Sequence, residues 1–73
     1  MDFNEMVKAL EKGHMVLVDY DQGQDGTHYH YVLALDGNSF VIKIFVDKSL
    51  FATQPYHLKL HHLSFKKWQI WEA

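Results

Sequence analysis

Residues 27–46, THYHYVLALDGNSFVIKIFV, decide the fold of this chain. Side chains alternate with a period of two through residues 27–35 and again through residues 40–46, which predicts two β-strands. The first strand carries Tyr29, Tyr31, Leu33 and Leu35 on one face and His28, His30, Val32 and Ala34 on the other. The second carries Phe40, Ile42, Ile44 and Val46 opposite Val41, Lys43 and Phe45. Between them, Asp36-Gly37-Asn38-Ser39 predicts a tight hairpin, because Gly and Asn tolerate positive φ.

The segment before this hairpin predicts a helix followed by another strand. Residues 3–12 place apolar side chains at helical spacing, and Asp2 is a suitable capping residue at their start. Gly13 follows at the position where a helix ends in the left-handed conformation. From residue 15 to residue 20 the period changes to two, and the polar, glycine-containing run 21–26 ends this strand.

The segment after the hairpin gives a weaker pattern. Within residues 47–55, Leu50 to Thr53 fit either a short edge strand or an apolar loop. A helical turn is expected at 59–66, and Trp68 to Trp71 predict a last strand whose Trp71 faces away from Trp68 and Ile70. We therefore expect one α+β domain over residues 1–73, with a short N-terminal helix packed on a small antiparallel sheet. That sheet would consist of a three-strand meander and a C-terminal strand.

Composition narrows the function classes. The chain has 73 residues, no cysteine, no arginine and a formal net charge of −2. Disulfides and thiolate zinc sites are thereby excluded, and no basic surface for direct nucleic-acid binding is expected. No apolar run approaches the roughly 20 residues of a membrane span, and the first residues lack the pattern of a signal peptide. We expect a soluble, cytoplasmic protein without membrane contact.

The strands carry more apolar surface than one helix can cover. We expect an outward set on the face away from the helix: Val16, Val18, Tyr20, Phe45 and Trp71. An apolar second face on so small a domain predicts a homo-oligomer, a dimer or higher, whose interface includes Val16, Val18, Phe45 and Trp71. The alternative is a strongly curled sheet whose second face is covered by the chain itself.

Signals for metal binding and catalysis are weak. His28 and His30 share a strand face and would form a metal site if Asp19 or Asp21 completed it; the alternative is a solvent-facing polar stripe. No phosphate-binding glycine loop or nucleophile motif is present. We expect no metal, no cofactor and no enzymatic activity. Without arginine, a phosphate-bearing ligand would depend on histidines, backbone amides and lysines such as Lys43, Lys48, Lys59, Lys66 and Lys67.

Both ends of the chain resemble a family of small bacteriophage proteins, the Thoeris anti-defence sponges. At the start, Phe3, a short amphipathic helix, Leu10-Glu11-Lys12-Gly13 and an apolar strand are similar to the family's opening. At the end, Tyr56, Leu58, Leu60 and Leu63 precede Trp68-Gln69-Ile70 and Glu72, similar to its closing motif. The family's basic residue and Gly-Trp element after the first strand are replaced here by Val18-Asp19-Tyr20-Asp21-Gln22.

The resemblance implies an oligomeric α+β protein that sequesters a cyclic-nucleotide-like immune signal without cleaving it. The expected function is therefore phage counter-defence in the host cytoplasm by stoichiometric binding. An adaptor or inhibitor that occludes a host defence protein is the alternative. The expected ligand- or partner-binding residues are Asp19, Tyr20, His28, His30, Tyr31 and Trp71.

Overall fold

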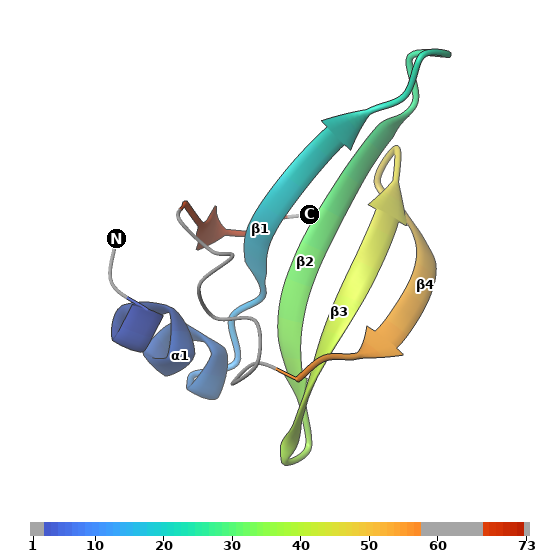
Figure 1. Cartoon of the computed structure of the whole chain (residues 1–73). Helices are drawn as coiled ribbons and strands as arrows, with labels where there is room; N and C mark the ends of the chain where they lie inside the picture. Colours follow the sequence, from blue (N-terminus) through green and yellow to red (C-terminus); the bar gives the residue numbers. More distant parts are fainter. Residues whose placement is uncertain (1–2, 58–66, 73) are drawn as a thin grey trace.

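The computed structural model describes residues 3–57 and 67–72, which form one helix and one antiparallel sheet (Figure 1). The elements are α1 (Phe3–Glu11), β1 (Val16–Gln22), β2 (His28–Asp36), β3 (Ser39–Val46), β4 (Ser49–Pro55) and β5 (Gln69–Ile70). The strand order is β4-β3-β2-β1-β5. The expected α+β class with a helix and an antiparallel sheet is confirmed. The helical turn expected at 59–66, with Leu58 and Leu63, lies outside the described residues.

The helix ends where the sequence predicts. Gly13 has a φ of 94°, its N–H donates to the carbonyl of Leu10 at 3.0 Å, and the N–H of His14 donates to Ala9 at 3.1 Å. This pair of bonds is a Schellman motif, which satisfies carbonyls that the last helical turn leaves free. The chain therefore turns sharply from α1 into β1.

The main core lies between α1 and one face of the sheet. Met6 and Leu10 of the helix are buried against Val16 of β1 and Leu33 of β2. Partly buried apolar side chains surround these four: Phe3, Val7, Ala9, Val18, Phe40, Tyr56 and Trp68. Figure 1 shows that α1 lies beside the end of the sheet at which β1 begins, so the helix covers only part of this face. We call it the helix face.

Two tight turns set the register of the meander. Gly37 has a φ of 63° between the paired residues Asp36 and Ser39, as expected for the first central residue of a type II′ turn. In the next turn Asp47 and Lys48 have φ values of 49° and 76°, the pattern of a type I′ turn. This second turn leads residues 49–55 back along β3 as a strand, β4. Of the two alternatives for this segment, the edge strand is confirmed and the apolar loop is wrong.

A β-bulge in β1 changes which residues share a face. Leu17 pairs with Val32 and Asp19 with Tyr31, so Val18 is the extra residue. Beyond the bulge the alternation is inverted: Val16 pairs with Leu33 on the helix face, whereas Tyr20 pairs with His30 on the opposite face. The expectation that Val16 and Val18 lie outward with Tyr20 is therefore wrong. Val16 is fully buried at 0% exposure and the half-buried Val18 packs against the same core, so both lie on the helix face.

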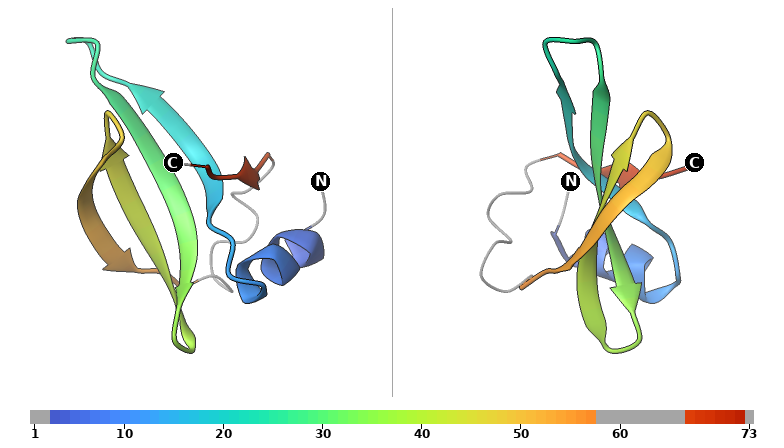
Figure 2. Two further views of the ribbon diagram at one scale, coloured as in Figure 1. Left: turned by 180° about the vertical axis from the view of Figure 1, so that it is seen from behind. Right: turned by 90° about the vertical axis from the view of Figure 1, so that its right-hand side faces the viewer.

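The last strand behaves as its sequence predicts. Ile70 pairs with Val16, Gln69 pairs with Leu17, and the N–H of Trp71 donates to the carbonyl of Met15 at 2.8 Å. Trp68 packs with the helix-face core, while Trp71 lies on the other side of the sheet. Viewed from behind, the segment after β5 runs across β1 (Figure 2, left). The second face of the sheet is thus partly covered by the chain itself.

Candidate functional site

The face opposite α1 carries a group of rings contributed by four separate segments. Tyr20 comes from β1, His28 and His30 from β2, Phe45 from β3 and Trp71 from the residue after β5. Register brings three of them into one row, because Tyr20 pairs with His30 and His30 pairs with Phe45. Leu50 of β4 extends this row as the partner of Phe45. We call this surface the aromatic face and define it by Tyr20, His28, His30, Phe45 and Trp71.

The five rings of the aromatic face form a continuous chain of contacts. Ring centroids of Tyr20 and His28 are 5.8 Å apart and those of Tyr20 and His30 are 4.9 Å apart. Trp71 lies 4.9 Å from His30 and 5.6 Å from Phe45, with both ring pairs tilted by 40°. These separations lie in the range in which aromatic pairs attract one another. The rings therefore support each other as one platform.

Burial along the platform is graded from Phe45 to Tyr20. Phe45 is buried at 9% exposure, His30 and Trp71 are half-buried, and Tyr20 is 47% exposed. The hydroxyl of Tyr20 is hydrogen-bonded to Nδ1 of His28, which fixes the tyrosine ring beside β2. One end of the platform is thus closed and the other presents an oriented ring to solvent.

Two ring nitrogens within the platform have no hydrogen-bond partner among the described residues. They are Nδ1 of His30 and Nε1 of Trp71, and both atoms are buried. Leaving a buried donor or acceptor unsatisfied costs about 1–3 kcal/mol. The aromatic face therefore holds polar groups that a bound molecule with complementary edges would satisfy.

His28 is also fixed from its other side by the β3–β4 turn. The N–H of Asp47 donates to the carbonyl of His28 at 2.9 Å, and the N–H of His28 donates to Oδ1 of Asp47 at 3.0 Å. This reciprocal pair joins the start of β2 to the turn at residues 47–48. The ring of His28 is thereby placed by two hydrogen bonds of its backbone and one of its side chain.

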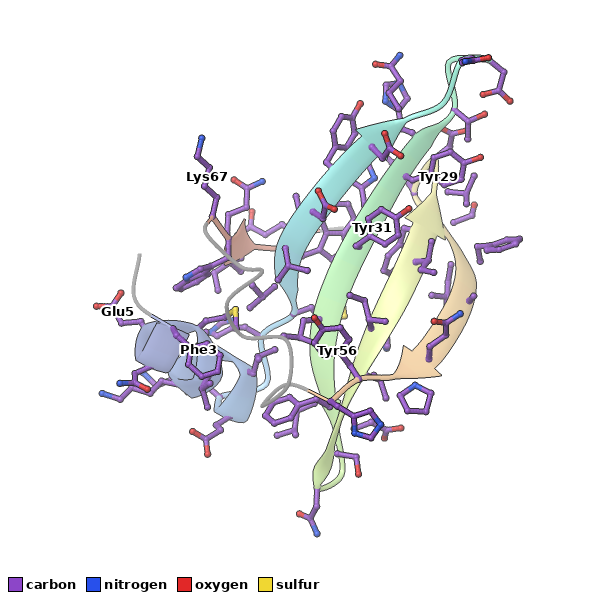
Figure 3. All side chains as sticks on the ribbon, viewed as in Figure 1. Phe3, Glu5, Tyr29, Tyr31, Tyr56 and Lys67 are labelled. Carbon is purple, nitrogen blue, oxygen red and sulfur yellow. The ribbon has the colours of Figure 1, made fainter. Side chains whose placement is uncertain are left out.

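Two of the predicted site residues lie on the helix face instead. Asp19 pairs with Tyr31 across β1 and β2, and Asp21 pairs with Tyr29, all beyond the bulge and opposite to Tyr20 and His30. Figure 3 shows Tyr29 and Tyr31 together on one side of the sheet. The structure therefore brings together Tyr20, His28, His30 and Trp71, and it separates Asp19 and Tyr31 from them.

The carboxylates of Asp19 and Asp21 accept hydrogen bonds from backbone amides of β1. Oδ1 of Asp19 accepts the N–H of Tyr20 at 2.8 Å, and Oδ1 of Asp21 accepts the N–H of Gln22 at 2.9 Å. β5 pairs with β1 only at Val16 and Leu17, so the rest of β1 is a sheet edge among the described strands. Each aspartate satisfies an amide of that edge, which hinders the addition of another strand.

In the part of the chain that the structure describes, no carboxylate completes a metal site with His28 and His30. Asp19 and Asp21, the carboxylates considered for it, lie across the sheet from His28 and His30. Over residues 3–57 and 67–72, no group of three or more metal-ligating side chains of the His, Cys, Asp or Glu type is present. The hypothesis of a site built from these four residues is therefore wrong.

Positive charge near the platform comes from lysines. Lys43 lies on the same face as Phe45, two residues earlier on β3, and its register partner is Val32. A hollow of about 350 Å³ beside the bulge is lined by Tyr20, Lys67 and Trp68, together with Asp19. Because Asp19 shares that hollow, Lys43 is the better placed cation for an anionic ligand on the aromatic face.

Sequence reasoning missed the apolar residues of β4. Leu50 and Phe51 are 54% and 74% exposed, and Phe51 is the extra residue of a bulge between the pairs Ile44–Ala52 and Phe45–Leu50. The signal that could have found them is the Val46-Asp47-Lys48-Ser49 spacing of a two-residue hairpin. That turn decides between the two alternatives for this apolar run and makes it an edge strand beside the platform.

Comparisons with models of protein families, with curated proteins and with solved structures gave no match for this chain. No helix in the described part of the chain is long and apolar enough to cross a membrane. Fold and site together define a small α+β protein with a preformed aromatic platform.

Proposed function

We propose that this protein is a stoichiometric binding protein that sequesters a nucleotide-like signal on its aromatic face without chemical conversion. The single observation that carries the proposal is the contact chain of Tyr20, His30 and Trp71, with centroids 4.9 Å apart at each step. Stacking of a base on an aromatic side chain is worth about 1–3 kcal/mol and suits any base. Lys43, on the same face, would neutralise a phosphate.

The biological setting we propose is phage counter-defence, in which a bound immune signal no longer reaches its receptor. The similarity of both chain ends to the Thoeris anti-defence sponges supports this choice of ligand class. Holding the ligand without converting it requires a platform that stacks and orients. The aromatic face combines stacking rings with two buried nitrogens that have no hydrogen-bond partner among the described residues.

Calorimetry against a panel of cyclic dinucleotides and cyclic ADP-ribose isomers tests this function. We expect saturable binding of one panel member and recovery of that compound unchanged by chromatography. Tyr20→Ala should weaken binding at least tenfold, while Tyr31→Ala, on the opposite face, should leave it within twofold. The absence of binding to every panel member, or equal effects of the two variants, would reject the proposal.

A second candidate function, occlusion of a host defence protein, is favoured by a different observation. Leu50 and Phe51 are the most exposed large apolar side chains among the described residues. Exposed apolar and aromatic residues at an edge are typical of protein interfaces. The test uses a bacterial host that carries the Thoeris defence and a phage that expresses this protein. Phe51→Ser should then abolish protection of the phage from the host defence, while Tyr20→Ala should preserve it. The reverse pattern would favour ligand sequestration.

We also propose that the protein assembles with copies of itself through side chains, not through strand pairing. The amides of Tyr20 and Gln22 are capped by aspartates at the β1 edge, and β4 contains a bulge and Pro55. These are features that block edge-to-edge pairing. Leu50 and Phe51 beside the aromatic face supply the apolar contact. Size-exclusion chromatography with light scattering checks this, and a single 8.6 kDa species at micromolar concentration would contradict it.

A further inference from the structure

Trp71 and His30, whose rings are in contact, each have a ring nitrogen without a hydrogen-bond partner among the described residues. Nδ1 of His30 and Nε1 of Trp71 are buried without a hydrogen-bond partner among the described residues, although the two rings are only 4.9 Å apart. Both nitrogens are therefore shielded from water without a replacement hydrogen bond among the described residues. Burial of a polar atom without a partner is unfavourable, so a group that supplied the missing hydrogen bonds would stabilise this end of the aromatic face.

The attachment of Trp71 to the sheet is short. β5 has two residues, Gln69 and Ile70, and both are exposed. Among the described residues, this segment is joined to the chain by its pairing with β1 and by the hydrogen bond from the N–H of Trp71 to the carbonyl of Met15 at 2.8 Å. The indole ring itself contacts Phe45, with ring centroids 5.6 Å apart, and His30. Few interactions need to break for the indole to move.

The rings on either side of His30 define the space that such a movement opens. Tyr20 lies 4.9 Å from His30 on one side and Trp71 lies 4.9 Å from it on the other. Tyr20 is held in place by its bond to His28, whereas Trp71 belongs to the short segment after β5. A planar ring that enters above His30 would stack between a fixed tyrosine and a movable tryptophan.

We propose that Trp71 is a movable cover of the aromatic face. It lies over His30 when the face is empty, and it lifts to admit a planar heteroaromatic ring with hydrogen-bonding groups on its edge. That ring pairs with Nδ1 of His30 and Nε1 of Trp71, so binding removes the penalty of the closed state. This inference rests on the proposed function, because the admitted ring is the base of the sequestered nucleotide.

The first test needs no ligand and uses the full chain labelled with 5-fluorotryptophan. Fluorine NMR gives one resonance for each tryptophan, and Trp71 is identified by its loss in Trp71→Phe. His30→Phe removes the unpaired nitrogen and keeps a ring under the indole. We expect the H2O/D2O isotope shift of the Trp71 resonance, a measure of solvent contact, to fall at least twofold in His30→Phe. Tyr31→Phe, on the opposite face, should leave it unchanged, and an isotope shift unaltered by His30→Phe would overturn the cover.

The second test separates the cover from the proposed function. Cyclic ADP-ribose and the cyclic dinucleotides are added to the labelled protein, and calorimetry is run on the same samples. A bound compound should shift the Trp71 resonance and leave that of Trp68 in place. Binding without a change in the Trp71 resonance would contradict the proposal that Trp71 is a movable cover. The proposed sequestration of a nucleotide would still stand. If His30→Phe lowers the isotope shift of Trp71 but no panel member binds, the result would support the movable cover. It would reject a nucleotide as the ligand.

Discussion

Trp71 lies against Phe45 with ring centroids 5.6 Å apart and ring planes 40° apart, on the face of the sheet that the helix does not reach. Phe45 is buried at 9% exposure there, together with Val32 and Ala34. A single helix leaves one face of a sheet open, and this chain closes part of that face with the residue that follows its last strand. The same contact builds the platform that we assign to ligand binding.

Phe45 and Phe51 offer a direct test of how this second face is held. Phe45→Ala removes a buried ring and should lower the free energy of unfolding by about 3 kcal/mol. Phe51→Ala makes the same chemical change at a side chain that is 74% exposed, so its effect should stay within about 0.5 kcal/mol. Urea unfolding followed by circular dichroism measures both. Equal losses in the two variants would mean that Phe45 is not packed as described.

Lys48→Gly should stabilise the protein. Lys48 has a φ of 76° in the β3–β4 turn, where a Cβ atom is unfavourable and glycine is not. We expect a gain of about 1 kcal/mol, or roughly 4–8 °C in melting temperature for a domain of this size. Lys48→Ala removes the same charge and keeps the Cβ atom, so it should give no gain. A gain of similar size in both variants would assign the effect to charge.

Asp19→Ala combined with Asp21→Ala should increase self-association. The two changes free the amides of Tyr20 and Gln22 at the β1 edge, which can then pair with a strand of another molecule. Light scattering over a concentration series should show larger species than in the parent protein. Glu5→Ala with Glu11→Ala, at two exposed positions of α1, alters net charge equally and keeps both caps of the β1 edge. Similar association in the two double variants would point to charge and not to the caps.

The β1–β2 loop should loosen when Asp25 is protonated. The N–H of Thr27 donates to Oδ1 of Asp25 at 3.0 Å, and this bond lowers the pKa of Asp25 below its usual 3.8. A lowered pKa means that the contribution of the carboxylate to stability is complete above pH 3.8 and is lost as pH falls through the lower folded value. NMR titration of the Thr27 amide should give a midpoint below 3.8, and Asp25→Asn should remove the transition. A midpoint at or above 3.8 would contradict the hydrogen bond.

Local sequence patterns determined much of this structure. Helix α1 with its Gly13 end, the faces of β2 and β3 and the turn at Gly37 all follow from periodicity and turn residues within a few positions. The opposite orientations of Trp68 and Trp71 follow in the same way from strand alternation. The shared strand face of His28 and His30 follows from the same alternation.

Tertiary structure decided what periodicity could not. The bulge at Val18 is set by pairing of β1 with β2, and it sends Val16 into the helix-face core while Tyr20 joins the aromatic face. It also places Asp19 on the helix face, where its carboxylate accepts the N–H of Tyr20 instead of facing His28. An alternation of two residues carries no information on where one strand gains a residue relative to its neighbour, because that register is fixed by partners distant in the sequence.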